Sequence, residues 1–224
     1  MLPVEYNGVS GTELVFGYDI ILELLFGAIT LVLGLTALKV YRLSGQRETK
    51  LFSAAFILIS ISYFVWALLN IIGFFRLSGA VCEALAIDDA KTLAAIGLML
   101  HMLLYLAGIV TWTFMTFRTE NNRVLTLLIV LTSAWLVLAY EKFWVFHVLI
   151  AILFVYLMIH YFSLFLKKPG RKTFLMLLAV FLLFLGSANF IFSIGYPVYY
   201  AVGHLFELSA YALILAELYF VMRK

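Results

Sequence analysis

The sequence predicts an all-α, polytopic membrane protein, a single domain that is a bundle of seven transmembrane helices with its N-terminus outside and its C-terminus inside. The 224 residues are 66% hydrophobic and 12% charged, with a mean hydropathy of +1.11. A soluble domain is about 45–50% apolar and about 25% charged. Because one span takes about 20 apolar residues, seven spans with short turns account for the whole chain. The first 17 residues lack the basic start and apolar run of a signal peptide, so the first span is expected to direct insertion.

Seven apolar stretches define the predicted spans, and short polar or basic segments separate them. The stretches run near 18–41, 49–74, 91–116, 123–140, 143–166, 172–194 and 197–222. The division between the fourth and fifth rests only on the polar segment 140–142, and hydropathy leaves open one longer element there. The longest outer connection, 75–90, is expected to be either an ordered loop or a short surface helix.

Lysine and arginine residues fall very unevenly on the two sides of the predicted bundle. One side carries 12 of the 15, namely Lys39, Arg42, Arg47, Lys50, Arg118, Arg123, Lys167, Lys168, Arg171, Lys172, Arg223 and Lys224. The other side carries Arg76, Lys91 and Lys142. Because lysine and arginine concentrate in short cytoplasmic loops, the heavily basic side is predicted to be the inner side of a cell membrane.

Several spans contain polar residues. Because ionisable groups within a membrane are costly, such residues are candidates for a functional site. In the predicted topology most of them lie in the outer half of the bundle, because they come early in inward-running spans or late in outward-running ones. The expected ligand-binding residues are Glu23, Asn70, His101, Tyr105, Asn189, His204 and Glu207. The alternative is that each residue only joins two helices by a hydrogen bond, worth about 0.6 kcal/mol on average.

The same region offers a second interpretation, a transition-metal or haem site. His101, His147 and His204 would make a three-histidine set, which Glu207 completes with a carboxylate suited to zinc, copper or iron. His204 and Glu207 share a helical face, although H-x-x-E is a common spacing. A haem between His147 and His204 is another option, since imidazole is a common axial ligand. His147 and His160 point about 140° apart on a helix and do not form a two-haem pair.

Two families of seven-helix proteins are similar in outline to the predicted fold. In the ceramidase and adiponectin-receptor group the last helix carries H-x-x-x-H, which is missing from 197–222. The sensory regions in front of some signalling kinases are similar in topology alone. Retinal proteins bind their chromophore through a lysine of the last span, and 197–222 contains none.

The leading hypothesis is a receptor- or sensor-like module that binds a small molecule, lipid or ion in a polar pocket in the outer half of the bundle, with an enzymatic role left open. Any signalling output would pass through a partner protein. The alternatives are a metal- or haem-binding membrane enzyme or redox protein, a small transporter, and a structural subunit of a membrane complex. No proline lies in the interior of a span, since Pro197 is only the first residue of the last one. This counts against a transporter with broken helices. Nucleic acid is not an expected partner, because the basic residues are ordinary membrane anchors.

Overall fold

The computed structural model describes residues 12–75, 77–87, 89–119, 121–193 and 196–222, and these residues form eight helices. The helices are α1 (Thr12–Ser44), α2 (Arg47–Phe74), α3 (Ser78–Leu85), α4 (Ala90–Thr116), α5 (Asn122–Leu138), α6 (Lys142–Lys167), α7 (Arg171–Phe192) and α8 (Pro197–Met222). In the described part of the chain, six of them are long and apolar enough to cross a membrane: α1, α2, α4, α6, α7 and α8. The all-α, multi-pass membrane character predicted from composition is therefore confirmed.

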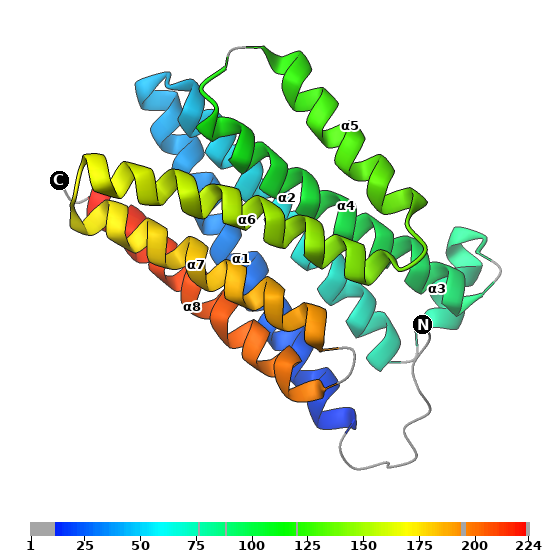
Figure 1. The fold of residues 1–224 in the computed structure, drawn as a ribbon. Coiled ribbons are helices and arrows are strands. Elements are labelled where there is room, and N and C mark those ends of the chain that lie inside the picture. The colour runs from blue at the N-terminus through cyan, green and yellow to red at the C-terminus, as the bar shows by residue number, and fades with distance from the viewer. Residues whose placement is uncertain (1–11, 76, 88, 120, 194–195, 223–224) are drawn as a thin grey trace.

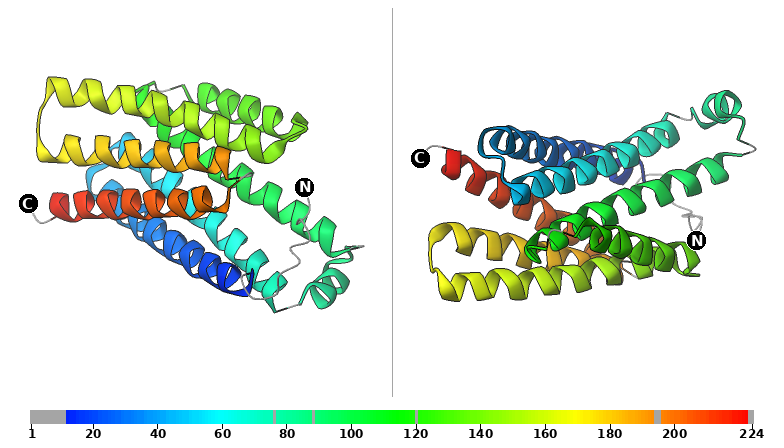
Figure 2. Two further views of the ribbon diagram at one scale, coloured as in Figure 1. Left: turned by 60° about the horizontal axis from the view of Figure 1, so that its bottom comes forward. Right: turned by 90° about the horizontal axis from the view of Figure 1, so that it is seen from above.

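The six long helices close into a ring (Figure 1). Around the ring, α1 packs on α2, α2 on α4, α4 on α6, α6 on α7, α7 on α8, and α8 back on α1. Contacts are extensive within the set α1, α2 and α4, and the successive pairs α6–α7 and α7–α8 are also closely packed. Where α4 meets α6 and α8 meets α1, contacts are sparser. The ring therefore consists of two three-helix units, α1–α2–α4 and α6–α7–α8 (Figure 2).

Small residues bring the helices of the first unit close together. A Cβ atom added at Gly34 of α1 would lie 2.8 Å from Ile57 Cγ1 of α2. At the same level, the Ser53 hydroxyl donates to the Gly34 carbonyl oxygen at 2.8 Å. A Cβ atom at Gly108 of α4 would lie 2.9 Å from the Ala55 carbonyl oxygen. Close backbone approach at small residues, with hydroxyl hydrogen bonds across the interface, is the usual way that helices associate in lipid.

Helix α5 lies outside the ring, against α4 and α6. The predicted break near 140–142 is confirmed, because α5 ends at Leu138 and α6 begins at Lys142; the alternative of one longer element is wrong. However, α5 has 17 residues, and at 1.5 Å per residue it is about 26 Å long, less than the roughly 30 Å of a hydrocarbon core. The stretch 123–140 is therefore not among the six candidate spans, and the expectation of seven is met only in part.

Three turns lie at the end of the bundle where α8 also terminates: α1–α2, α4–α5 and α6–α7 (Figure 1). The basic residues that were predicted to face inward lie in these turns or in the adjoining ends of the helices. Arg223 and Lys224 lie outside the described residues. Arg47 ties two of the turns together. Its guanidinium donates to the Thr119 carbonyl oxygen and, at 2.8 Å, to Asn122 Oδ1. It also lies over the Phe114 ring, 5.6 Å from the centroid.

At the opposite end of the bundle, the connection 75–90 contains a short helix, α3. The surface helix, one of two structures expected for this connection, is therefore present. The next helix, α4, begins at a defined cap, since the Asp89 carboxylate accepts a hydrogen bond of 2.6 Å from the Thr92 amide. Asp is a preferred N-cap residue because its side chain satisfies one of the free amides of the first turn.

Candidate functional site

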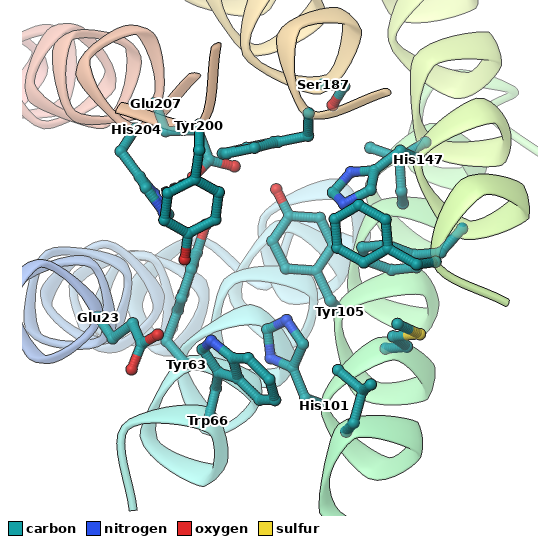
Figure 3. Close-up of a pocket in the computed structure, with 16 residues that line it drawn as sticks. Glu23, Tyr63, Trp66, His101, Tyr105, His147, Ser187, Tyr200, His204 and Glu207 are labelled. Atoms are coloured by element: carbon teal, nitrogen blue, oxygen red, sulfur yellow. Dashed lines mark ion pairs between the residues drawn. The ribbon is translucent and has the colours of Figure 1, made fainter. Parts of the chain in front are cut away.

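A cavity of about 90 Å³ lies between the two three-helix units. Figure 3 shows its polar and aromatic lining. The labelled residues are Glu23, Tyr63, Trp66, His101, Tyr105, His147, Ser187, Tyr200, His204 and Glu207. The remaining lining residues are apolar: Leu98, Met102, Phe143, Phe146, Ile150 and Phe190. Each of the six ring helices thus contributes to the wall, and the lining combines apolar surface with a few polar groups, as small-molecule sites do.

The cavity lies in the half of the bundle remote from the basic turns. Its residues come early in α1, α6 and α8, which begin at that end, and late in α2 and α7, which finish there. Among these lining residues, all of them in the described chain, there is neither lysine nor arginine. The acidic side chains on the wall are therefore Glu23 and Glu207.

Glu23 of α1 is held in place by Asn70 of α2. The Asn70 side-chain amide donates to both carboxylate oxygens of Glu23, at 2.7 and 2.9 Å. Glu23 is only 1% exposed, and a buried carboxylate is costly unless it is paired and hydrogen-bonded. Asn70 does not line the cavity, so it acts as the group that orients Glu23 and supports its burial.

His204 and Glu207 lie one helical turn apart on α8. Their closest atoms, His204 Nδ1 and Glu207 Oε2, are 3.5 Å apart, and the two side chains are 9% and 8% exposed. At that separation the pair makes an electrostatic contact without a hydrogen bond. Both ring nitrogens of His204 are buried without a hydrogen-bond partner. A buried polar group in this state carries a desolvation cost of about 1–3 kcal/mol.

Aromatic rings surround the His204 imidazole. The ring of Tyr200 meets it edge-on, with centroids 4.5 Å apart, and Phe190 does the same at 5.0 Å. Phe26 stacks on it at 5.7 Å. These contacts fix the plane of the imidazole but offer its nitrogens nothing to bond to. The position of His204 is therefore determined by packing, while its hydrogen-bonding capacity remains available to an occupant of the cavity.

His101 of α4 presents an acceptor to the cavity. Its Nδ1 lies 2.9 Å from the Ser62 carbonyl oxygen. A carbonyl oxygen only accepts, so Nδ1 must carry the proton, and in the neutral ring Nε2 is left as an acceptor. The ring packs at 5.3 Å from Trp66 and 6.1 Å from Tyr105. A single backbone contact thus sets the tautomer of this pocket histidine.

Three buried tyrosines form a hydrogen-bonded group beside the cavity. The Tyr211 hydroxyl lies 3.2 Å from that of Tyr63 and 3.2 Å from that of Tyr105. Tyr63 and Tyr105 line the cavity, and Tyr211 lies behind them. Because the three residues belong to α2, α4 and α8, the group connects both three-helix units. The hydroxyls can reverse their donor and acceptor roles together, which lets the wall adapt to what it contacts.

The structure brings five of the seven expected binding residues to the cavity wall: Glu23, His101, Tyr105, His204 and Glu207. Asn70 lies just behind, bonded to Glu23. Asn189 does not take part, because its amide donates to the Leu185 carbonyl oxygen of its own helix at 2.8 Å. Whether the five residues bind a ligand remains a prediction.

The proposed metal ligands His101, His147, His204 and Glu207 also line this cavity. Figure 3 shows the three imidazoles on different sides of it, on α4, α6 and α8. Among the described residues, no group of three or more His, Cys, Asp or Glu side chains is arranged to hold a metal ion. A cavity of about 90 Å³ is also well below the roughly 300–1,000 Å³ of sites for larger ligands, which disfavours haem. Both cofactors stay untested predictions.

The binding set expected from the sequence omits several residues of the wall. Trp66 lies three residues after Tyr63 and four before Asn70 on α2. This spacing places it on the same helical face as both, so the sequence could have indicated that it belongs to the wall. Ser187 and Phe190 of α7 offered none, because small and apolar residues are equally common at lipid-facing and interior positions. Their role follows from helix order around the ring, which hydropathy does not contain.

A scan of protein-family models, a search of curated proteins and a search of solved structures each found no match to this chain.

Proposed function

We propose that this protein is a receptor-like module of the cell membrane that binds a small polar molecule in the cavity between its two three-helix units. The observation that carries the proposal is His204. Its side chain is nine-tenths buried on the cavity wall, and neither ring nitrogen has a hydrogen-bond partner. A purely structural polar residue would be bonded to a neighbouring helix, as Asn70 and Ser53 are, or within its own helix, as Asn189 is. A ligand that bonds to His204 would recover the cost of its burial.

Two observations support the proposed topology of seven crossings with the N-terminus outside. Helix α5 runs beside α4 and α6 and returns the chain to the end of the bundle where α4 began (Figure 1), which a crossing helix would do. Its shortness is tolerable, because a bilayer thins around a short span at a modest cost. The basic turns gather at one end, and lysine and arginine are retained on the cytoplasmic side. In this topology the cavity belongs to the outer half of the membrane.

The ligand acts through the contact between the two units in this proposal. Because the α4–α6 and α1–α8 contacts are sparse, the units can shift relative to each other more easily than the helices within each unit can. An occupant that contacts both three-helix units favours one position of the units relative to each other. A partner protein in the membrane or at the inner turns would bind preferentially to that position. A ligand shifts such an equilibrium only by its difference in affinity for the two positions.

Thermal unfolding of the purified full chain tests the proposal. The protein is heated with small compounds grouped by chemistry: amines, carboxylates, alcohols and sugars. We expect at least one group to raise the unfolding temperature of the wild type and of Asn189→Ala, because ligands that bind only the folded state stabilise it. The same group should have no effect on His204→Ala. No shift with any group, or equal shifts in all three proteins, would contradict ligand binding in the cavity.

A further inference from the structure

We infer that the ligand of the cavity is a small organic cation, an amine or ammonium compound of a few non-hydrogen atoms. The inference rests on the proposed function and names the chemical class of the occupant. Its basis is the combination of two carboxyl groups, imidazole acceptors and several aromatic rings around one cavity, with neither lysine nor arginine among the described lining residues.

The acidic side chains of the lining favour a positive occupant. Glu23 and Glu207 face the cavity from α1 and α8. Asn70 donates to both oxygens of Glu23, but each carboxylate oxygen has a second lone pair that can accept from an N–H group. Glu207 Oε2 lies 3.5 Å from His204 Nδ1. An anion placed here would meet two carboxylates and have no arginine or lysine to pair with.

The acceptors suit N–H donors. His101 offers Nε2 as an acceptor, because its Nδ1 is used by the Ser62 carbonyl oxygen. His204 has both ring nitrogens without a partner, so one of them is an acceptor in the neutral ring. Together with Glu207 these groups provide acceptors on α4 and α8, on opposite sides of the cavity (Figure 3). An ammonium group with several N–H donors can bond to both units at once.

The aromatic lining suits a cation with apolar substituents. Rings from five of the six ring helices face the cavity: Trp66, Tyr105, Phe146, Phe190 and Tyr200. Ring faces attract cations, and cages of aromatic side chains are the usual way that proteins recognise substituted ammonium groups. A bare sodium or potassium ion has no apolar substituents to place against these rings.

The size of the cavity limits the ligand. One buried water needs about 10–15 Å³, so about 90 Å³ holds several atoms of that size. Sites for drug-sized ligands measure roughly 300–1,000 Å³. A large amphiphile would have to open the two units apart, whereas a simple amine fits the cavity as it stands.

Binding of ammonium compounds to the purified full chain tests this inference. The probes are methylammonium, tetramethylammonium and choline, each compared with sodium and potassium chloride. The critical control is the uncharged carbon isostere of choline, in which carbon replaces nitrogen. Binding is followed through tryptophan fluorescence, to which Trp66 on the cavity wall contributes. We expect at least one ammonium probe to bind saturably, and choline to bind roughly tenfold or more tightly than its isostere.

Two matched variants locate the binding. Glu207→Gln should weaken ammonium binding by roughly 30-fold or more, because it removes the charge that faces the cation. Glu217→Gln makes the same substitution at another glutamate of α8, which does not line the cavity. It should leave binding unchanged. If Glu207→Gln does not fold, Trp66→Leu replaces it. Because this variant lacks the Trp66 fluorophore, its binding is measured by titration calorimetry, with an expected loss of roughly 3- to 30-fold for the ammonium probes.

The outcomes separate this inference from the proposed function. Equal binding of choline and its isostere, equal effects of sodium or potassium chloride, or no binding of any ammonium probe would overturn the assignment of an organic cation. If carboxylates, alcohols or sugars stabilise the protein through His204 and amines do not, the binding function stands and only the cation assignment fails. If no compound stabilises the protein, both fail.

Discussion

Glu23 is buried in α1 because Asn70 of α2 supplies hydrogen bonds to both of its carboxylate oxygens. The two residues lie 47 positions apart in the chain, so the sequence around either residue does not indicate that they form a pair. Their contact serves two purposes at once. It fixes α1 against α2, and it aims a carboxylate at the cavity between the two three-helix units.

Asn70→Leu should therefore destabilise the protein, by about 1–3 kcal/mol, because it leaves the buried Glu23 carboxylate without its donor. The unfolding of the purified protein by heat or denaturant measures the change. Asn189→Leu is the matched control, since the Asn189 amide donates to a carbonyl oxygen of its own helix. Similar losses of stability in the two variants would mean that the bond to Glu23 has no special role.

The identities of the polar residues could be predicted from the sequence, but their partners could not. His204 and Glu207 were expected to share a helical face, and they do, since they are three residues apart on α8. The tautomer of His101 depends on the Ser62 carbonyl oxygen of another helix. That contact follows from how closely α2 and α4 pack, which no local pattern encodes.

At the scale of the elements, glycines decide how close neighbouring helices come. Gly108 of α4 faces the backbone of α2, where an added Cβ would lie 2.6 Å from Ile59 Cγ1 and 2.9 Å from the Ala55 carbonyl oxygen. A carbonyl oxygen of the backbone cannot move aside as a side chain can. The helices would have to separate, and the packing beneath the cavity would loosen.

Gly108→Ala should accordingly destabilise the folded protein by about 1–3 kcal/mol. Gly73 of α2 provides the opposite case, because nothing lies within 4 Å of a Cβ added there. Gly73→Ala should be neutral or stabilising by up to about 1 kcal/mol, through the higher helix propensity of alanine. Unfolding measurements on both variants test the difference in sign, and a Gly108→Ala protein as stable as wild type would refute the close approach.

The helices themselves follow well from hydropathy, because each ring helix is an apolar stretch bounded by polar or basic residues. Hydropathy is less informative about α5 and α3. The stretch 123–140 is as apolar as its neighbours, yet the helix there has only 17 residues, and it packs outside the ring. The choice between an interior and a peripheral position depends on contacts with α4 and α6, not on composition.

At the scale of the whole molecule, the cavity owes its existence to the order of helices around the ring. The sequence predicted polar residues at one depth in several spans. It did not predict that the two three-helix units would meet with sparse contacts, nor that the polar residues would face each other across that junction. A one-dimensional pattern gives the depth of a residue along its helix, whereas the neighbours of that helix depend on the packing of all of them.

The side of the membrane from which the cavity can be reached is the most direct measurement to make. In a Cys82→Ala background, Tyr200→Cys places a thiol on a partly exposed part of the cavity wall, and Pro169→Cys places one in the exposed α6–α7 turn. Intact cells are treated with a small thiol reagent that does not cross membranes. We expect the cysteine at 200 to react in intact cells, and the cysteine at 169 to react only after permeabilisation. Reaction of 169 in intact cells, with 200 protected, would contradict an outward-facing site.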